Sequence, residues 1–257
     1  MNSRRKYITI GLLIGLIVLL SGCRSLEQPI TAESTGFWSK FFVYPMSQLI
    51  TFFAELVSNY GLAIIIVTLI IRLLLLPLNV KQIRSTIAMQ KIQPELQALQ
   101  KKYSSKDANT QQKLQQETMA LFQKHGANPL AGCLPILVQM PILIAMYQAI
   151  MRTEAIKEGD FLWLQLGTPD PFYLLPIIAG GATYFQQKLM MADSPASDNP
   201  QMKMMLYMMP IMITVIAFIL PSALGLYWVV GNLFMVAQTV FVRKPMMEQA
   251  NTGGENK

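Results

Sequence analysis

Long apolar segments alternate with shorter polar segments along most of the chain, and this pattern predicts membrane-spanning helices. About 20 apolar residues cross a hydrocarbon core of roughly 30 Å as a helix. Five segments come close to this length: residues 60–80, 130–151, 172–190, 203–220 and 223–242. We therefore expect an all-α integral membrane protein with five transmembrane helices.

The polar segment at residues 81–129 has the composition of two helices joined by a turn, which predicts a helical hairpin. It carries eight Lys or Arg residues against Glu95, Asp107 and Glu117. Loops rich in Lys and Arg stay in the cytoplasm. The loop at 152–171 holds more acidic than basic residues, so we place it outside the cell. The loop at 191–202 and the tail at 243–257 then lie in the cytoplasm.

The first 22 residues have the organisation of a signal peptide. A basic start, Arg4-Arg5-Lys6, precedes an apolar stretch, and residues 20–23 read Leu-Ser-Gly-Cys. Small residues before a cut site are typical of secretory signals. The four residues resemble a bacterial lipobox, which implies cleavage before Cys23 and lipid attachment to its sulfur. The alternative is an uncleaved anchor with an incidental cysteine.

The segment at residues 23–59 follows this signal and is predicted to lie outside the cell. Its first part is a polar linker. Residues 37–58 place aromatic and aliphatic side chains at helical spacing, interrupted by Lys40, Gln48 and Glu55. This arrangement is typical of an amphipathic helix lying in the membrane interface.

Composition supports the membrane assignment and narrows the chemistry. Of 257 residues, 53% are hydrophobic and 14% are charged, against about 25% charged in soluble domains. The net charge of +7 indicates cytoplasmic loops facing anionic lipid before it indicates nucleic acid. A single histidine and two cysteines give neither a metal-ligand cluster nor a disulfide framework. We expect no metal and no cofactor.

Arg72 stands in the middle of the first predicted span, with no acid inside that span to neutralise it. A charge at a helix centre costs about 2.5–3.5 kcal/mol on insertion scales, and such residues usually face a bundle interior or a water-filled cavity. The alternative is snorkelling of the long side chain to an interface. The inner interface is some 10–12 Å away at 1.5 Å per residue, so we favour a hydrated cavity.

Other polar side chains within the spans fit the same cavity. With Arg72 they form a predicted substrate groove: Thr68, Asn79, Gln139, Gln187, Trp228 and Asn232. Each amide alone has another interpretation, an interhelical hydrogen bond worth about 0.6 kcal/mol. Methionine is a flexible gap-filler at binding surfaces that accept varied partners. We therefore also predict a hydrophobic slide for apolar segments, formed by Met140, Leu226, Met204 and Met208.

Three stretches of the chain strongly resemble the YidC family of membrane protein insertases. The first is Thr68-Leu69-Ile70-Ile71-Arg72, followed by Pro77-Leu78. The second is Asn128-Pro129-Leu130-Ala131-Gly132-Cys133-Leu134-Pro135, with Gln139-Met140-Pro141-Ile142. The third is Pro221-Ser222-Ala223-Leu224, with Leu226-Tyr227-Trp228 and Asn232-Leu233. The lipobox resembles the Gram-positive branch of that family.

The resemblance implies a function that makes and breaks no bond, so we expect no catalytic residue and no enzyme activity. Family members take hydrophobic segments of nascent membrane proteins into a positively charged groove open to cytoplasm and lipid, then release them into the bilayer. They act alone or with the Sec translocon, and aid the folding of membrane proteins and lipoproteins. The implied partners are substrates with acidic N-terminal tails, membrane lipids, the Sec translocon, and ribosome or signal-recognition components. The implied location is the bacterial plasma membrane.

Other function classes fit the residues less well. Proton-coupled transport usually needs an intramembrane acid or histidine, and the predicted spans contain none, although an anion channel built on Arg72 remains open. An intramembrane protease would need a base beside Ser58 or Ser222, and none is at membrane depth. Direct nucleic-acid binding is not expected, because the basic hairpin lacks interleaved aromatic residues.

Overall fold

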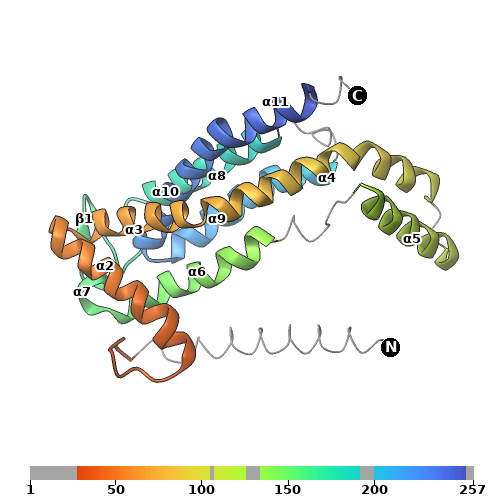
Figure 1. The fold of residues 1–257 in the computed structure, drawn as a ribbon. Helices are drawn as coiled ribbons and strands as arrows, with labels where there is room; N and C mark the ends of the chain where they lie inside the picture. Colours follow the sequence, from red (N-terminus) through yellow and green to blue (C-terminus); the bar gives the residue numbers. More distant parts are fainter. Residues whose placement is uncertain (1–27, 105–106, 126–133, 192–199, 253–257) are drawn as a thin grey trace. The chain divides into compact units, whose positions relative to one another are not determined.

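The computed structural model describes residues 28–104, 107–125, 134–191 and 200–252. Most of these residues lie in helices (Figure 1). The predicted signal peptide, Cys23, the centre of the hairpin turn and the beginning of the second predicted span lie outside the described residues. The chain forms two compact units. The first comprises Met1–Thr68, Val138–Leu175 and Ala217–Tyr227, and the second Leu69–Leu137, Pro176–Ile216 and Trp228–Lys257.

The first unit contains the predicted amphipathic helix. A π-helical turn η2 (Ser39–Val43) leads into α2 (Tyr44–Val57), which ends at Ser58 in the left-handed conformation, φ +53°. Helix α2 buries Ile50 and Ala54 on one side and exposes Phe52 and Leu56 on the other. One side of α2 therefore packs inside the first unit, while its other side presents apolar side chains, and the interfacial location of the helix stays a prediction.

Helix α3 (Tyr60–Leu74) begins directly after α2. The side chain of Asn59 accepts a hydrogen bond of 2.9 Å from the N–H of Leu62, which caps the helix N-terminus. The part of α3 within the first unit buries Ala63, Ile64 and Val67. An apolar core of helical side chains therefore anchors the beginning of the first predicted span.

The helix of the first predicted span ends earlier than residue 80. Helix α4 (Leu76–Lys102) follows α3 after a break at Leu75, and the two axes are bent by 56°. Pro77 stands in the first turn of α4. Proline lacks an N–H, and its ring clashes with the carbonyl oxygen four residues earlier, so it kinks or ends a helix that reaches it. Residues 76–80 consequently belong to the same helix as the first arm of the hairpin.

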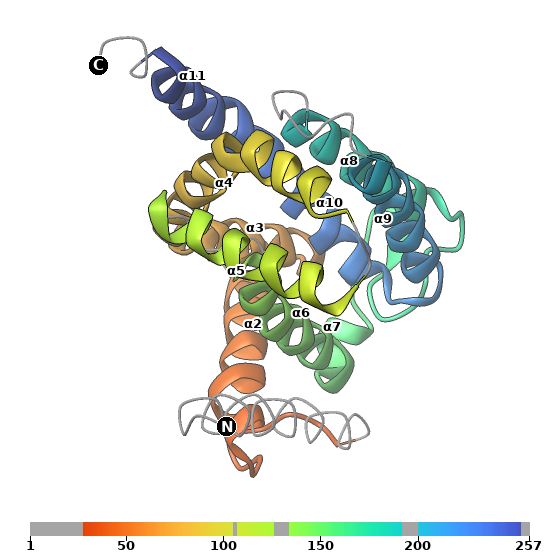
Figure 2. The same cartoon turned by 90° about the vertical axis from the view of Figure 1, so that its right-hand side faces the viewer.

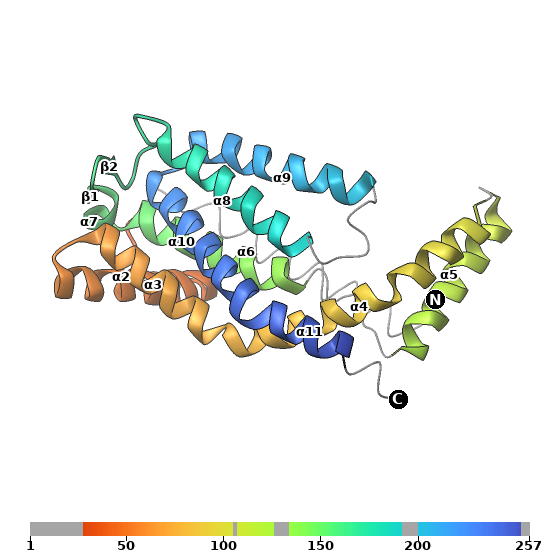
Figure 3. The same cartoon turned by 90° about the horizontal axis from the view of Figure 1, so that it is seen from above.

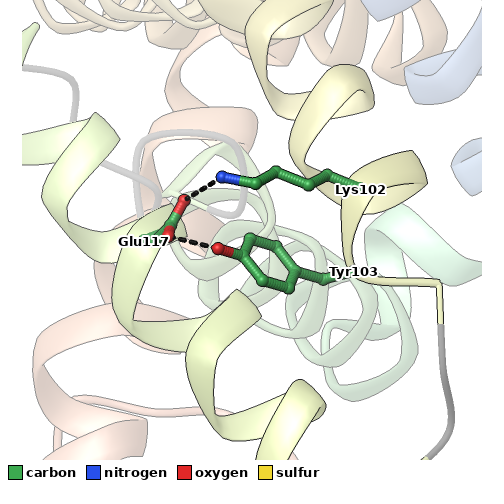
Figure 4. Close-up of polar contacts among 3 residues, drawn as sticks. All are labelled: Lys102, Tyr103 and Glu117. Atoms are coloured by element: carbon green, nitrogen blue, oxygen red, sulfur yellow. Dashed lines mark hydrogen bonds and ion pairs between the residues drawn. The ribbon is translucent and has the colours of Figure 1, made fainter.

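The second arm of the hairpin is α5 (Ala108–Lys124). Its N-cap is Asp107, whose carboxylate accepts a hydrogen bond of 2.8 Å from the N–H of Thr110. Helices α4 and α5 lie side by side (Figure 1). Near the turn, the Tyr103 hydroxyl donates to Glu117, and the ammonium of Lys102 lies 3.9 Å from the same carboxylate (Figure 4).

The loop at 152–171 contains more structure than the sequence analysis predicts. Helix α6 (Leu134–Arg152) leads into the single turn α7 (Glu154–Lys157). Two short strands, β1 (Asp160–Phe161) and β2 (Leu164–Gln165), then pair as an antiparallel hairpin. Phe161 packs over Gly61 at the beginning of α3, where a Cβ atom would collide with the ring. The hairpin is therefore seated on a helix within the first unit.

Three further helical segments complete the chain: α8 (Leu174–Met191), α9 (Pro200–Ile219) and α10 (Ser222–Gln238), the last continuing through η4 (Thr239–Arg243) into α11 (Lys244–Thr252). In the second unit α8 and α9 run beside each other (Figure 2), with Thr214 against Gly180. The end of α11 lies beside α4 (Figure 3), where Lys91 donates to the carbonyl of Ala250.

Length and hydropathy identify fewer spans than the sequence pattern predicts. Among the described residues, one continuous helix, Ser222–Ala250, is long and apolar enough to cross a membrane. The bent pair α3 and α4 passes the same test when taken together. Shorter apolar helices cover Leu137–Arg152 and Lys203–Ile219. The all-α architecture is confirmed, whereas the count of five spans stays a prediction.

Candidate functional site

Arg72 lies against the helix α10 within the second unit. It occupies the last turn of α3 and is half-buried. A Cβ atom built on Gly231 would stand 2.6 Å from Nη2 of Arg72 and 3.4 Å from its central guanidinium carbon. The guanidinium therefore fills the space beside α10 that only a glycine leaves open.

The positive charge of Arg72 has no counter-charge in the part of the chain that the structure describes. The ion pairs found there join Lys102 to Glu117 and His125 to Glu95, both in the hairpin. No side-chain hydrogen bond of Arg72 is found among the described residues either. A half-buried cation without a fixed partner attracts anions more strongly than an exposed one, because the dielectric around it is lower.

Asn232 follows Gly231 on α10 and is hydrogen-bonded to α8. The hydroxyl of Thr183 donates to the carbonyl of Ala179 at 2.7 Å, which leaves its oxygen free to accept. The amide nitrogen of Asn232 donates to that oxygen at 2.8 Å. This chain of two bonds fixes the orientation of the Asn232 amide and ties α10 to α8 beside Arg72.

Gln187 lies one turn further along α8. Its amide nitrogen donates to the sulfur of Met209 on α9. Its oxygen Oε1 is buried and receives no hydrogen bond from the residues described. A buried acceptor without a donor costs about 1–3 kcal/mol. Water or a bound polar group that donates to Oε1 would recover that free energy.

Two predicted groove residues lie in the first unit instead. Thr68 is fully buried and its hydroxyl donates to the carbonyl of Ile64 at 2.6 Å, within its own helix. Gln139 on α6 donates through its amide to the hydroxyl of Tyr227 on α10 at 2.6 Å. For Gln139 the structure therefore shows an interhelical hydrogen bond, one of the two interpretations that its sequence position allows.

The remaining predicted groove and slide residues are also divided between the two units. Asn79 and Trp228 belong to the second unit and are half-buried. Of the predicted slide, Met204 and Met208 lie in the second unit and are 58% and 60% exposed. Met140 and Leu226 lie in the first unit, where Met140 is exposed but Leu226 is buried. The second unit thus contains Arg72, Asn79, Gln187, Trp228 and Asn232, and the two exposed methionines.

The sequence analysis missed three residues that shape this part of the molecule. Gly231 provides the space for Arg72. Thr183 provides the hydrogen-bond acceptor for Asn232. Small residues gather where membrane helices approach closely, so their presence in apolar segments was the available signal. Arg243, predicted to begin an exposed tail, is 2% exposed and reaches Gln90 on α4 at 3.5 Å.

The described residues present charged, amide and apolar side chains to a possible binding partner. They hold no group of three or more His, Cys, Asp and Glu side chains that could bind a metal. What the second unit offers is one unpaired guanidinium, amide groups on α8 and α10, and exposed methionine side chains on α9.

Comparison with known proteins identifies the chain. A family described as the 60Kd inner membrane protein matches residues 52–250. The chain is 62% identical over 256 residues to the membrane protein insertase MisCA of Bacillus subtilis, covering 96% of this chain and 98% of that one. It is 63% identical over 250 residues to the membrane protein insertase YidC of Oceanobacillus iheyensis, covering 95% and 98%.

A solved structure supports the same relationship. The crystal structure of an active YidC insertase with its first transmembrane domain resolved matches with a TM-score of 0.63 at 30% identity. The match covers 80% of this chain and 47% of that one. The sequence motifs, the family match and the similar helical fold all point to the same family. The chain therefore belongs to the YidC family of membrane protein insertases.

Proposed function

We propose that this protein inserts hydrophobic segments of nascent membrane proteins into the bilayer, with Arg72 as the charge that receives their polar ends. The observation that carries the proposal is the half-buried guanidinium beside Gly231, which has no ion pair among the described residues. Two unit charges 4 Å apart attract by about 4 kcal/mol at an effective dielectric of 20, before desolvation costs. An acidic N-terminal tail is a substrate feature that this charge would favour.

The neutral part of the groove supports the same mechanism. Asn232 and Gln187 place amide groups beside the path of a polar chain. The Oε1 atom of Gln187 is a hydrogen-bond acceptor that has no donor among the described residues. A polar stretch bound there crosses less lipid before it reaches the far side. The apolar stretch that follows contacts Met204 and Met208 and moves into the bilayer, where burial of its apolar surface drives the step.

The proposal includes the topology that the sequence predicts. The mature chain has five spans, with the N-terminus outside the plasma membrane, anchored by lipid on Cys23, and the tail inside. The basic hairpin then faces the cytoplasm, where nascent chains arrive from the ribosome, with or without the Sec translocon. Charge bias along the sequence supports this orientation.

The test uses proteoliposomes that contain only this protein. A single-span substrate with an acidic N-terminal tail is presented, and protection of that tail from external protease is measured for wild type and Arg72→Ala. We expect protection with wild type and a loss of most protection with Arg72→Ala. A matched substrate whose tail acids are replaced by amides should be inserted similarly by both proteins.

Each alternative result has a distinct meaning. Equal protection of the acidic tail by both proteins would refute the role of Arg72 and leave an insertase that relies on hydration and apolar contacts. Protection by neither would refute autonomous insertion. Anion conductance in a planar bilayer that disappears with Arg72→Ala would favour a channel instead.

A further inference from the structure

The loop between α6 and α8 exposes a group of large apolar side chains. We name this group the loop surface: Leu162, Trp163, Phe172, Tyr173 and Leu174. Leu162 is 74% exposed at the tip of the β1–β2 hairpin, and Phe172 is 70% exposed just before α8. All five residues belong to the first unit. Exposed apolar groups of this size mark interaction sites on proteins.

A buried carboxylate holds the loop surface in place. Asp170 is 2% exposed, and its Oδ1 accepts hydrogen bonds from Nε1 of Trp163 at 3.1 Å and from the N–H of Phe172 at 3.0 Å. Its Oδ2 accepts from the N–H of Leu175 at 2.6 Å. One side chain thus fixes the Trp163 ring and the entry into α8, so the exposed rings are not loosely placed.

The backbone at the hairpin tip is strained. Leu162 has φ +56°, a left-handed conformation that non-glycine residues rarely adopt. A strained conformation persists where the surrounding structure determines it, and it gathers at functional positions. Here the conformation presents a leucine to the surroundings of the protein, where glycine would relieve the strain.

The loop surface continues into the apolar surface at the ends of α8 and α9. The ring of Tyr173 packs against that of Phe218 with 5.4 Å between centroids, and Ile219 beside it is 74% exposed. Exposed charges are segregated from this area along the chain. Those of the loop occur at Glu154, Lys157, Glu158 and Asp160, before Phe161, and the one charge from Phe161 to Leu174 is the buried Asp170.

We propose that the loop surface lies in the headgroup region of the bilayer and contacts phospholipid at the boundary with the acyl chains. Trp and Tyr are enriched at that depth. The N–H of Trp163 already donates to the buried Asp170, which leaves the apolar ring to contact lipid. Lipid is the occupant that fits, since the surface is continuous with the exposed ends of two apolar helices. The inference rests on the membrane location of the family and is independent of insertase activity.

The experiment uses the fluorescence of Trp163 in the full-length protein reconstituted in phosphatidylcholine–phosphatidylglycerol vesicles. Trp38→Phe and Trp228→Phe leave Trp163 as the single tryptophan. We compare quenching by lipids brominated near the top of the acyl chain with quenching by aqueous iodide. Strong quenching by bromolipid and weak quenching by iodide are expected. Asp170→Asn should reverse the order, because it weakens the bonds that hold the ring.

Two further variants control for folding and for location. Leu162→Gly removes the strain, so it should raise the melting temperature in detergent while reducing bromolipid quenching of Trp163. A single tryptophan placed on the exposed hairpin helix by Lys113→Trp, with Trp38→Phe, Trp163→Phe and Trp228→Phe, should be quenched by iodide alone. These results separate lipid contact from general protection of the ring.

Either of two outcomes would overturn the proposal. Efficient iodide quenching of Trp163 without bromolipid quenching would place the loop surface in water. Protection from both quenchers would show that protein covers it, and dependence of that protection on the protein-to-lipid ratio would identify a second copy as the cover. Both outcomes leave the insertion assay unaffected, so failure here is distinguishable from failure of the proposed function.

Discussion

The guanidinium of Arg72 occupies the space that a side chain at Gly231 would fill, with Nη2 at 2.6 Å from the position of the missing Cβ. Within the second unit, α3 and α10 therefore meet where the charged side chain of Arg72 lies against Gly231, which has no side chain. The position of the charge therefore depends on a residue that carries no chemistry. Asn232, next to Gly231, is held by Thr183 at the same place along α10.

Gly231→Ala should weaken insertion without weakening the fold. Alanine is favoured over glycine in a helix by about 1 kcal/mol, and the atom in the way is the far end of a flexible side chain. Arg72 should therefore move, at little cost to folding. We expect a melting temperature in detergent no lower than that of wild type. Protease protection of an acidic tail should fall between the wild-type and Arg72→Ala values.

The matched control for this prediction is Gly181→Ala on α8, where a Cβ atom meets no neighbouring atom within 4 Å. It has the same gain in helix propensity and should leave insertion at the wild-type level. Equal insertion by Gly231→Ala and Gly181→Ala would show that the position of Arg72 beside Gly231 has no effect on substrate insertion.

Thr183→Val should remove the acceptor of Asn232 while keeping the shape of the side chain. Interhelical hydrogen bonds in membrane proteins contribute about 0.6 kcal/mol on average, so we expect a small loss of unfolding free energy. Thr239→Val is the control, since Thr239 is buried and its hydroxyl donates to the carbonyl of Met235 in the same way, without a cross-helix partner. Urea unfolding in mixed micelles measures both. Identical losses would mean that the bond to Asn232 contributes nothing.

Arg152→Met should release the segment that precedes α2. The buried guanidinium of Arg152 donates to the carbonyl of Gln28 at 2.8 Å and to the hydroxyl of Ser39 at 3.0 Å. Hydrogen bonds from charged groups contribute about 1.5–3 kcal/mol. We expect faster proteolysis before residue 39 and a lower melting temperature.

The control is Arg84→Met on the exposed side of α4, which removes the same charge and should change neither quantity. Unchanged proteolysis in Arg152→Met would show that other contacts hold the segment. The rate of cleavage, followed by mass spectrometry, distinguishes a local release from unfolding of the whole protein.

Helices were the features most predictable from the sequence, because apolar segments and their periodicity act locally. The break at Leu75 was harder to predict, because the hydropathy of residues 60–80 is continuous. Pro77 is the only residue in that stretch that signals an interruption of the helix. A proline near the end of a span is compatible with a kink or with a new helix, and packing decides between them. The two hairpin arms were predicted from their polar composition, whereas the role of Asp107 as the cap of α5 is seen only in the structure.

The candidate site was predictable as a list of polar residues but not as a set of contacts. Arg72 and Asn232 stand out because polar groups are costly in lipid. In the structure Thr68 and Gln139 each form a hydrogen bond within the first unit, Thr68 inside its own helix and Gln139 to Tyr227. Hydropathy contains no information on which helix a given amide faces. The buried arginines Arg152 and Arg243 were missed for a related reason, since charged residues at span ends are normally exposed.

The contacts at the tip of the helical hairpin predict an order of effects on the pKa of Lys102. The Tyr103 side chain, and after it the Glu117 carboxylate, raise the pKa of Lys102 above its ordinary value of 10.5. A raised lysine pKa stabilises the folded hairpin at all pH values below 10.5, and this stabilisation is lost as the pH rises through the folded-state pKa. The hairpin should therefore show no loosening from Lys102 between neutral pH and 10.5. Titration of the Lys102 ammonium by NMR in micelles should show the larger fall in pKa for Tyr103→Phe and the smaller for Glu117→Gln. The reverse order would contradict the ranking of Tyr103 above Glu117 in their effects on Lys102, whose ammonium shares the Glu117 carboxylate with the Tyr103 hydroxyl in Figure 4.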